Sequence, residues 1–360
     1  MKILHCINSP HIGGIERLVI DLGIAQQKSD VDVSIMLNTR DGQYYNYLNE
    51  QEIPILDSNI KGGFDLNLST YKALKHKFNT FQIIHMHSFS PICALAAKHS
   101  SAKIVYTIHG LSKGIRKENK IKYALREFIK SYALNTVDAL IANSQHTLTL
   151  AKKHYGLNKV MNNVVLNGIK LTEIENQNNF VQNEYLTIGL VSRFTHRKRI
   201  DRLVNAFDQL LKKEVNARLI LVGDGVAFES VKNHIGRLNL SHSIDLIGYS
   251  ENVDHYYQKF DVCVHPSDNE GFGLVAVEAY INGKPVIAFS DSGGLVEVIK
   301  PLDPKNIVNT QDELTERLFW YYHNKNEISK DKLKRINYVK ENFSIERMER
   351  QYFNVYKKLI

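Results

Sequence analysis

Residues 2–27, KILHCINSPHIGGIERLVIDLGIAQQ, contain a short apolar run, a glycine pair and then a longer amphipathic stretch. The run at 2–8 is typical of a buried strand, and the apolar residues after Gly14 recur at helical spacing. The same order returns at 81–99 and at 138–156, and again after residue 186. Because strands that alternate with helices form parallel βαβ units, the sequence predicts an α/β fold with doubly wound sheets.

The chain length indicates two domains. At 360 residues the chain exceeds what one hydrophobic core usually organises. The alternation stops in a polar stretch at 171–185 and then restarts, so we expect domains at 1–170 and 186–342 with a linker between them. Residues 343–360 indicate a final helix with Ser344 as its N-cap. Open α/β sheets bind ligands beyond the carboxyl ends of their strands, which favours a site in strand-to-helix loops that face a central cleft.

The composition narrows the partners only slightly. The net charge of +8 and the pI near 9.1 indicate an anionic partner, a property that nucleic-acid binders, membrane-surface proteins and enzymes of phosphorylated substrates share. Cys6, Cys93 and Cys263 are expected to be buried free thiols in a reducing compartment. We expect no signal peptide, no transmembrane helix and a cytoplasmic location, because the chain enters a strand at once and lacks an apolar run of about 18 residues.

The first loop that could bind a ligand is NSPHIGGIERLV, in which Gly13 and Gly14 stand between a predicted strand and a predicted helix. Glycines at this position let backbone amides approach an anion at the positive end of the helix. The alternative is an ordinary turn. The loop lacks the full G-x-G-x-x-G pattern, which argues against a nicotinamide-dependent enzyme.

The second loop, LVSRFTHRKRIDRLV, carries Arg193, Arg197, Lys198 and Arg199. Four crowded cations repel one another unless an anion neutralises them, and a diphosphate suits this role through forked guanidinium contacts. The alternative is a solvated basic helix start, which the helix dipole disfavours. The pattern therefore predicts an anion site.

The third loop, SDNEGFGLVAVEAY at 267–280, holds Glu270 in a turn and Glu278 in the helix that follows. Eight helical residues would separate the two carboxylates by about 12 Å, which is too far for work on one bond and favours two separate roles. Helix-start amides favour an anion or a hydroxyl oxygen, while carboxylates accept hydroxyl protons. The alternative for Glu278 is an exposed surface glutamate, which its apolar neighbours disfavour.

Together these motifs resemble family 4 of the retaining nucleotide-sugar glycosyltransferases, which have the GT-B fold of two Rossmann-like domains. The resemblance rests on Gly13-Gly14, on Arg193 with Lys198, and on E-x7-E from Glu270 to Glu278. The phrases IIHMHS, TIHG, ANS, LNGI, GDG and GKPVIAFSDSGGLVEVI are also similar to this family, in the same order. The resemblance covers nearly the whole chain.

The resemblance implies a role for each matching residue. The N-terminal domain would bind the acceptor, and the second domain would bind a nucleoside-diphosphate sugar. The C-terminal helix would cross back onto the first domain. Arg193 and Lys198 would hold the diphosphate, Glu278 the ribose, and Glu270 the transferred sugar, while His109 would lie beside the reacting sugar. The remaining donor-binding residues implied are Gly13, Gly14, Gly223, Gly271, Phe272, Gly273 and Leu274.

Two departures from the family pattern concern the edge of the second domain. Val296 stands where the family usually has proline, and the segment after Ile299 lacks the usual glycine-led strand. These departures affect the region expected near the nucleotide base and leave the expected diphosphate site unchanged.

A metal or cofactor is not expected. Asp30 and Asp32 form a D-x-D, but they precede a predicted strand and read as loop residues. His85 and His87 alternate on one strand and share a face, yet their spacing does not match a short metal motif. We expect structural roles for these two histidines and a metal-independent enzyme.

The stretch 111–130, LSKGIRKENKIKYALREFIK, carries seven basic residues against two acidic ones, with Ile121, Leu125, Phe128 and Ile129 on one helical stripe. Such stretches are typically amphipathic helices with a solvated face. The alternative is contact with an anionic membrane that bears a lipid-linked acceptor.

The sequence thus predicts a retaining hexosyltransferase that uses a nucleoside-diphosphate sugar and a glycan or lipid-linked acceptor. Bacterial surface polysaccharide or lipopolysaccharide assembly is the setting that the resemblance implies. The rival within the same fold is a nucleotide-sugar epimerase or hydrolase. A nucleic-acid-binding protein is disfavoured, because the tightest cation cluster lies in a predicted phosphate loop rather than among exposed aromatic residues.

Overall fold

The computed structural model describes residues 1–11, 13–61, 67–111, 120–157, 160–171 and 184–360, with the backbone alone at 120–122. The chain divides into two compact units. Unit 1 comprises Met1–Lys170 and Ser344–Ile360, and unit 2 comprises Leu171–Phe343. Most of the expected linker at 171–185 lies outside the described residues.

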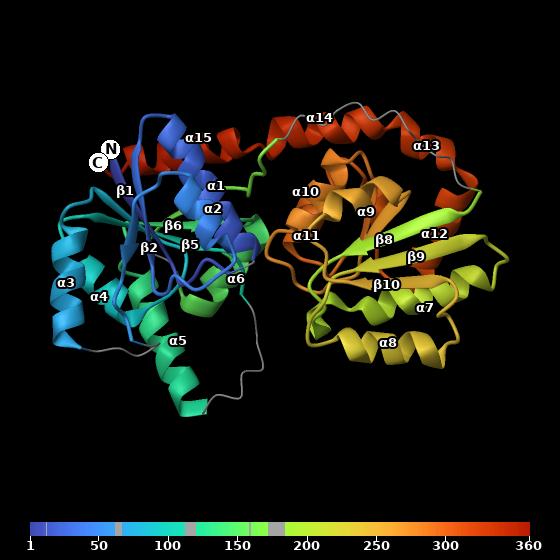
Figure 1. The fold of residues 1–360 in the computed structure, drawn as a ribbon, viewed down its shortest axis with the longest axis horizontal. Coiled ribbons are helices and arrows are strands. Elements are labelled where there is room, and N and C mark those ends of the chain that lie inside the picture. The colour runs from blue at the N-terminus through green and yellow to red at the C-terminus, as the bar shows by residue number, and fades with distance from the viewer. Residues whose placement is uncertain (12, 62–66, 112–119, 158–159, 172–183) are drawn as a thin grey trace. The chain divides into compact units, whose positions relative to one another are not determined.

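Unit 1 is built on a sheet of seven parallel strands in the order β3-β2-β1-β4-β5-β6-β7 (Figure 1). The strands are β1 (Lys2–Ile7), β2 (Asp32–Leu37), β3 (Ile55–Asp57), β4 (Ile83–Met86), β5 (Lys103–Ile108), β6 (Ala139–Ala142) and β7 (Met161–Val164). The helices of this unit are α1 (Gly14–Lys28), α2 (Tyr44–Glu50), α3 (Leu68–Phe78), α4 (Pro91–Lys98), α5 (Lys120–Leu134), α6 (Gln145–Tyr155) and α15 (Ile345–Lys357).

The two faces of this sheet carry separate apolar clusters. Successive residues of a strand point to opposite faces, so Leu4 and Cys6 pack in one cluster while Ile3 and Ile7 pack in the other. Residues of α3, α4, α5 and α6 complete the first cluster. Residues of α1, α2 and α15 complete the second. Helices therefore cover both faces, as a doubly wound parallel sheet requires.

The C-terminal helix α15 belongs to unit 1. Ser344 Oγ accepts a hydrogen bond from the backbone N–H of Arg347 at 3.3 Å, so the expected N-cap is confirmed. The helix lies beside α1 (Figure 1). It buries Met348, Tyr352 and Tyr356 in the same cluster as α1. The expectation that this helix packs on the first domain is confirmed.

Unit 2 is built on six parallel strands in the order β10-β9-β8-β11-β12-β13. The strands are β8 (Leu186–Val191), β9 (Ala217–Val222), β10 (Ile244–Gly248), β11 (Val262–His265), β12 (Val286–Phe289) and β13 (Ile307–Val308). The helical segments are η1 (His196–Lys198), α7 (Ile200–Leu211), α8 (Phe228–Arg237), α9 (Val253–Lys259), α10 (Leu274–Ile281), α11 (Gly294–Ile299), η2 (Pro304–Asn306), α12 (Gln311–His323), α13 (Lys325–Lys330) and α14 (Lys332–Asn342).

The last strand of unit 2 supplies the edge that the sequence left open. β13 has two residues, Ile307 and Val308, and pairs parallel with β12. Val308 is buried in the main cluster of the unit. The segment after Ile299 therefore ends the sheet with a short strand, although it lacks the glycine-led pattern.

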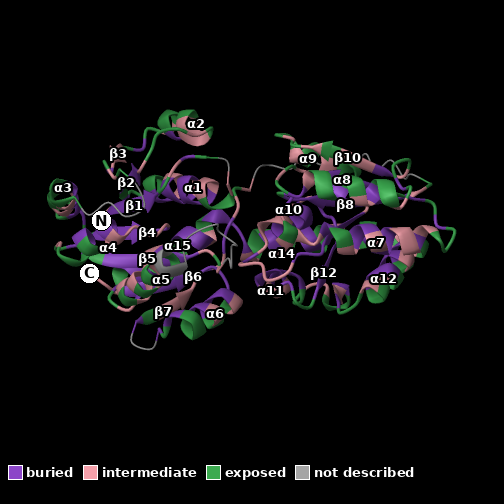
Figure 2. Ribbon diagram, turned by 90° about the horizontal axis from the view of Figure 1, so that it is seen from below, coloured by how far each residue is buried: buried purple, intermediate pink, exposed green. Residues whose placement is uncertain are grey.

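The predicted fold class is confirmed, since both units are parallel, Rossmann-like α/β sheets. Buried residues, purple in Figure 2, run through the strands of both sheets, and exposed residues, green, lie on the outward faces of helices such as α8 and α12. Cys6, Cys93 and Cys263 are buried free thiols, as expected. None of the helices in the described ranges combines the length and the apolar content needed to cross a membrane.

Two glycines of unit 2 give a matched pair of fold tests. A Cβ at Gly189, in β8, would lie 2.2 Å from atoms of the Phe260 ring, whereas a Cβ at Gly236, in α8, would meet nothing within 4 Å. We expect Gly189→Ala to destabilise the unit by about 1–3 kcal/mol through overpacking. Gly236→Ala should stabilise it by about 0.4–1 kcal/mol, because alanine restricts the unfolded chain.

Trp320 makes the measurement specific to unit 2, because it is the only tryptophan of the chain and lies in α12. Its fluorescence during urea unfolding gives the midpoint for each variant. Equal midpoints for Gly189→Ala and the unsubstituted protein would contradict the packing described for Phe260.

Candidate functional site

The carboxyl edge of the unit 2 sheet has a topological switch point between β8 and β11. From β8 the chain passes to β9 and β10 on one side and then returns to β11 on the other. The connections that follow β8 and β11 therefore lead to opposite sides of the sheet. Open α/β sheets bind ligands at such points.

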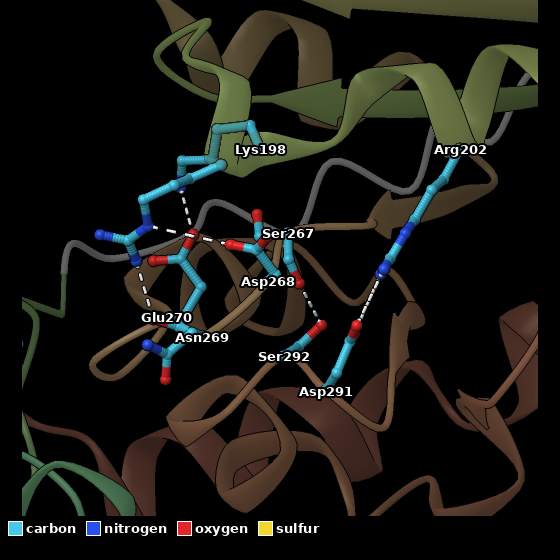
Figure 3. Close-up of polar contacts among 9 residues, drawn as sticks. Lys198, Arg202, Ser267, Asp268, Asn269, Glu270, Asp291 and Ser292 are labelled. Atoms are coloured by element: carbon cyan, nitrogen blue, oxygen red, sulfur yellow. Dashed lines mark hydrogen bonds and ion pairs between the residues drawn. The ribbon is translucent and has the colours of Figure 1, made fainter. Parts of the chain in front are cut away.

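An ion pair joins these two loops. Lys198 Nζ, in η1 after β8, donates to Glu270 Oε1, in the loop after β11, at 2.7 Å (Figure 3). The two side chains are 20% and 17% exposed. Burial by itself raises the pKa of Glu270, but the Lys198 charge and hydrogen bonds from Lys198 and Ser267 outweigh burial and lower it. Glu270 is therefore a carboxylate at neutral pH.

The loop after β12 fixes the backbone of Glu270. The Glu270 N–H donates to Ser292 O at 3.1 Å, and Gly294 N–H donates to Glu270 O at 2.8 Å. Ser292 Oγ donates to Ser267 O at 2.6 Å (Figure 3). The loop after β12 thus bonds both the N–H and the carbonyl of Glu270, while Lys198 in the loop after β8 bonds its side chain. Ser292 belongs to the SDSGG segment, which resembles the family, but no pattern in the sequence predicted its contacts with the loop of Glu270.

The other cations of the basic loop are paired with acceptors of the chain itself. Arg197 donates to Asn269 O at 2.7 Å and lies 4.0 Å from Asp268. Arg199 forms an ion pair with Asp201 at 3.1 Å. Arg193, at the start of the loop, is exposed. A bound anion is therefore not needed to relieve the crowding, because neighbouring acids and a carbonyl already do so. The anion site itself stays a prediction.

Arg202 and Asp291 form a further pair that the sequence did not suggest. Both guanidinium ends of Arg202 donate to the carboxylate, at 2.9 and 2.8 Å (Figure 3). Arg202 also lies over the Phe289 ring, with its Cζ 4.6 Å from the ring centroid. This pair ties α7 to the loop after β12.

Gly223 lies where the loop after β9 approaches the loop after β8. Its φ is +136°, and a Cβ would come 1.8 Å from Ser192 O. Only glycine fits this approach. The GDG motif is thus explained by loop packing, and a donor contact of Gly223 stays a prediction.

Glu278 lies in the second turn of α10 and is partly buried. Tyr257, from α9, donates its hydroxyl to Glu278 Oε2 at 3.1 Å. Burial raises the pKa of Glu278, and the hydrogen bond from Tyr257 only partly offsets it. Glu278 is therefore not an exposed surface glutamate, and Tyr257 is a partner that no motif marked.

The start of α10 has the geometry expected of an open helix N-terminus. Gly273 is the N-cap with φ +98°, and no side chain caps the helix. Leu274 is its first residue, and Gly271 precedes it in the loop. The Phe272 side chain is buried against Phe343, so only its backbone is suited to ligand contact.

His265 is a further buried group beside this loop. It ends β11, and its Nε2 has no hydrogen-bond partner among the residues that the structure describes. Burial lowers the pKa of His265 to about 3, and the nearby Lys198 charge acts in the same direction. His265 is thus a neutral imidazole near the Lys198–Glu270 pair.

The remaining predicted residues lie in unit 1. Gly13 is the N-cap of α1, which starts at Gly14 after β1. The backbone at Gly13 is extended, so its conformation alone does not require glycine. His109 follows β5, and its carbonyl accepts a hydrogen bond from Asn143 Nδ2 at 2.9 Å.

Among the described residues, one group has the spacing to hold a metal ion. It consists of His5, His85 and His87, whose ligand atoms lie within 4.8 Å of one another. All three imidazoles are buried. The expectation that His85 and His87 share a face is confirmed. Asp30 and Asp32 stand in the turn before β2 and at its first residue, where Asp30 adopts a left-handed conformation with φ 58°.

Models of known protein families match both halves of the chain. Residues 12–173 match the model of "Glycosyltransferase Family 4", and residues 172–341 match that of "Glycosyl transferases group 1". A 41.2 kDa protein in the cps region of Klebsiella pneumoniae is 32% identical over 71% of this chain and 72% of its own length. The N-acetyl-α-D-glucosaminyl L-malate synthase of Bacillus anthracis is 29% identical over 66% of this chain and 64% of its own length.

Solved structures are similar over the full length. Anabaena HepE, solved in complex with UDP, matches with a TM-score of 0.82 over 99% of this chain and 100% of its own, at 20% identity. HepE has also been solved with UDP-glucose. The fold of the two units is thus that of known glycosyltransferases, and the expected enzyme class, a hexosyltransferase, is confirmed. With both halves matched by family models, the chain belongs to the group 1, family 4 glycosyltransferases.

Proposed function

We propose that this glycosyltransferase moves a hexose from a nucleoside-diphosphate sugar to an acceptor hydroxyl with retention of the anomeric configuration. The reaction forms a bond between C1 of the hexose and the acceptor oxygen and breaks the bond between C1 and the diphosphate. The acceptor's proton passes to an oxygen of the leaving diphosphate. The UDP and UDP-glucose complexes of HepE support this class of donor.

The Lys198–Glu270 pair at the switch point carries the proposal. An ammonium has three N–H donors, and the bond to Glu270 uses one of them. The pair holds Lys198 in place while leaving donors for a phosphate oxygen. Beyond the bonds from Lys198 and Ser267, the two carboxylate oxygens of Glu270 have further lone pairs that can accept from a sugar hydroxyl. Arg193, exposed in the same loop, adds a second cation that can turn toward a diphosphate.

The ribose and the sugar find suitable groups nearby in unit 2. Glu278 uses Oε2 to accept from Tyr257, which leaves Oε1 for a ribose hydroxyl. The uncapped start of α10 at Gly273 offers backbone N–H groups. These free acceptor and donor groups support the donor-binding roles that the resemblance implies.

We assign the developing negative charge of the leaving diphosphate to Lys198 and Arg193 rather than to a divalent cation. Preorganised charges of this kind are usually the largest catalytic contribution. The D-x-D at Asp30 and Asp32 stands at the amino end of β2, whereas open α/β sheets bind ligands beyond the carboxyl ends of their strands. The proposed enzyme is metal-independent.

The proposed setting is the assembly of a bacterial surface polysaccharide or lipopolysaccharide. The relative in the cps region of Klebsiella pneumoniae supports this setting. The α-monoglucosyldiacylglycerol synthase of Streptococcus pneumoniae, which is 28% identical over 50% of this chain, supports a lipid-linked acceptor.

The reaction can be followed by NMR with a panel of nucleoside-diphosphate hexoses, with and without a bacterial glycolipid extract as acceptor. We expect hexose transfer that needs the acceptor, keeps the donor's anomeric configuration and continues in EDTA. Inversion would overturn the retaining assignment, and loss of transfer in EDTA would overturn metal independence. Release of free or isomerised sugar at the same rate without acceptor would identify the hydrolase or epimerase instead.

Substitution of the two cations tests the diphosphate site. Lys198→Ala and Arg193→Ala should each lower turnover by on the order of 10²-fold or more, because each removes a charge from the leaving group. Calorimetry with UDP should show weaker binding for both variants. Lys212→Ala, which removes an exposed lysine paired with Asp208 on α7, is the control and should leave both measurements unchanged. Near-normal turnover of both site variants would remove the assignment.

We further propose that α5 brings the enzyme to an anionic membrane that carries the acceptor. Leu125, Phe128 and Tyr132 are 52%, 72% and 59% exposed, and their spacing places them on one face of the helix. Of the predicted stripe, Leu125 and Phe128 are therefore solvent-exposed and Ile129 is half-buried, while the Ile121 side chain lies outside the described residues. The basic residues at 112–119 and the side chains at 120–122 lie outside the described residues. Exposed apolar groups next to basic residues are typical of interfacial helices.

Vesicle sedimentation tests this role. The protein should bind vesicles with anionic lipid better than neutral vesicles at low salt, because each basic residue near the surface adds about 1 kcal/mol. The double substitution Leu125→Ser with Phe128→Ser should weaken binding about tenfold or more. Leu333→Ser removes a leucine of unit 2 that is 67% exposed and should have no effect. Equal binding to neutral and anionic vesicles would contradict the proposal.

A further inference from the structure

A polar seam crosses the face of the unit 1 sheet that α1 and α15 cover. His5, His85 and His87 are 0%, 0% and 6% exposed, and they come from the neighbouring strands β1 and β4 or from the residue after β4. Gln26, from α1, is also fully buried. Buried polar groups are costly unless they are hydrogen-bonded, so the partners of each ring nitrogen matter.

Two of these rings, His5 and His87, join Gln26 to His109 in one continuous chain of hydrogen bonds. His109 Nε2 lies 3.1 Å from His87 Nδ1. His87 Nε2 lies 3.0 Å from His5 Nδ1. His5 Nε2 lies 2.7 Å from Gln26 Oε1. His109, at the far end, is one of the residues expected at the reaction centre.

The rings are neutral. Burial lowers the pKa of His5 and of His109 to about 4. Burial, with the neighbouring imidazoles, places the pKa of His87 well below its usual value. A neutral imidazole has one N–H donor and one acceptor nitrogen. Each ring in the chain therefore donates on one side and accepts on the other.

The Gln26 carbonyl sets the direction of the whole chain. Since Oε1 can only accept, His5 donates from Nε2 and accepts at Nδ1. His87 must then donate from Nε2 and accept at Nδ1, and His109 must donate from Nε2. The opposite direction would need a donor at the Gln26 end. His109 Nδ1 is left as an acceptor, and this buried atom has no hydrogen-bond partner among the described residues.

We propose that Gln26, acting through His5 and His87, holds His109 as the Nε2–H tautomer, so that Nδ1 accepts a hydrogen bond from a substrate hydroxyl. Gln26, His5 and His87 are positioning residues, and His109 is the group that touches substrate. The inference rests on the proposed function for the role of His109, while the tautomer itself depends only on contacts within unit 1. A buried acceptor without a partner is costly, and a hydroxyl of a bound sugar would recover that cost.

The same imidazoles do not form a metal site as they stand. His85 uses both ring nitrogens, Nδ1 with the Tyr356 hydroxyl at 2.6 Å and Nε2 with Thr107 Oγ1 at 2.7 Å. His5 and His87 are engaged at both nitrogens by the chain. A cation bound by all three rings would have to break at least two of these bonds.

Nitrogen NMR of the protein labelled with 15N-histidine tests the tautomer without substrate. The His109 signals are assigned by comparison with His109→Asn. We expect His109 at pH 7 to be neutral and protonated on Nε2. A proton on Nδ1, a charged ring or stoichiometric zinc in the purified protein would each overturn the inference. This measurement uses the unsubstituted protein and so does not depend on the folding of a variant.

Gln26→Met tests the positioning role, because it removes the acceptor while keeping the length of the side chain. We expect His109 to lose the fixed Nε2–H tautomer and turnover to fall about tenfold or more, with a smaller change in KM for the donor. Tyr352→Phe is the control: it removes a buried hydroxyl that lies 3.3 Å from Thr107 Oγ1 on the same face but outside the chain. It should leave the tautomer and turnover unchanged.

The outcomes separate this inference from the proposed function. An unchanged tautomer in Gln26→Met overturns the control by Gln26. A changed tautomer with unchanged turnover overturns the role of Nδ1 in catalysis. If the unsubstituted protein transfers no sugar at all, the proposed function fails, yet the NMR result still decides whether Gln26 sets the tautomer.

Discussion

The ion pair between Lys198 and Glu270 is the contact on which the loops of unit 2 depend. It links the loops after β8 and β11 across the switch point of the sheet. A largely buried pair is tolerated only when further hydrogen bonds satisfy both partners. Ser267 bonds the Glu270 side chain, and the loop after β12 bonds its backbone. The loops after the three neighbouring strands β8, β11 and β12 are therefore held in one arrangement, with their polar side chains close together.

Pairing cations with acids before a ligand arrives has two opposing effects. A side chain that is already ordered loses less conformational entropy when it binds a ligand. The ligand must, however, share or displace the carboxylate that holds the cation. Lys198 meets both demands, because one N–H goes to Glu270 and an ammonium has two more. Arg199, whose exposed guanidinium pairs with Asp201, is held beside its own helix start and is less suited to a ligand role.

Periodicity in the sequence predicts the strands and helices, and alternation on β4 places His85 and His87 on one face. It does not predict the partners that come from distant helices. Tyr257 reaches Glu278 from α9, and Gln26 reaches His5 from α1, but neither lies in a motif. Such contacts depend on how each helix is rotated against the sheet, which local spacing does not determine. For the same reason, the sequence shows the cluster of cations in the basic loop and not the acids that face it.

The buried histidines of unit 1 fall into two networks with different consequences. His85 bonds the Tyr356 hydroxyl of α15 and Thr107 of β5, so all of its polar atoms are satisfied. Sliding α15 by one turn would break the bond to Tyr356, which gives the C-terminal helix a defined register on the sheet. The chain from Gln26 to His109 instead ends at an acceptor without a partner in the described residues. Gln26 Nε2, at the other end, also has no partner among the described residues. A ligand hydroxyl at His109 Nδ1 would relieve part of this cost, so the first network holds the fold and the second is suited to prepare a site.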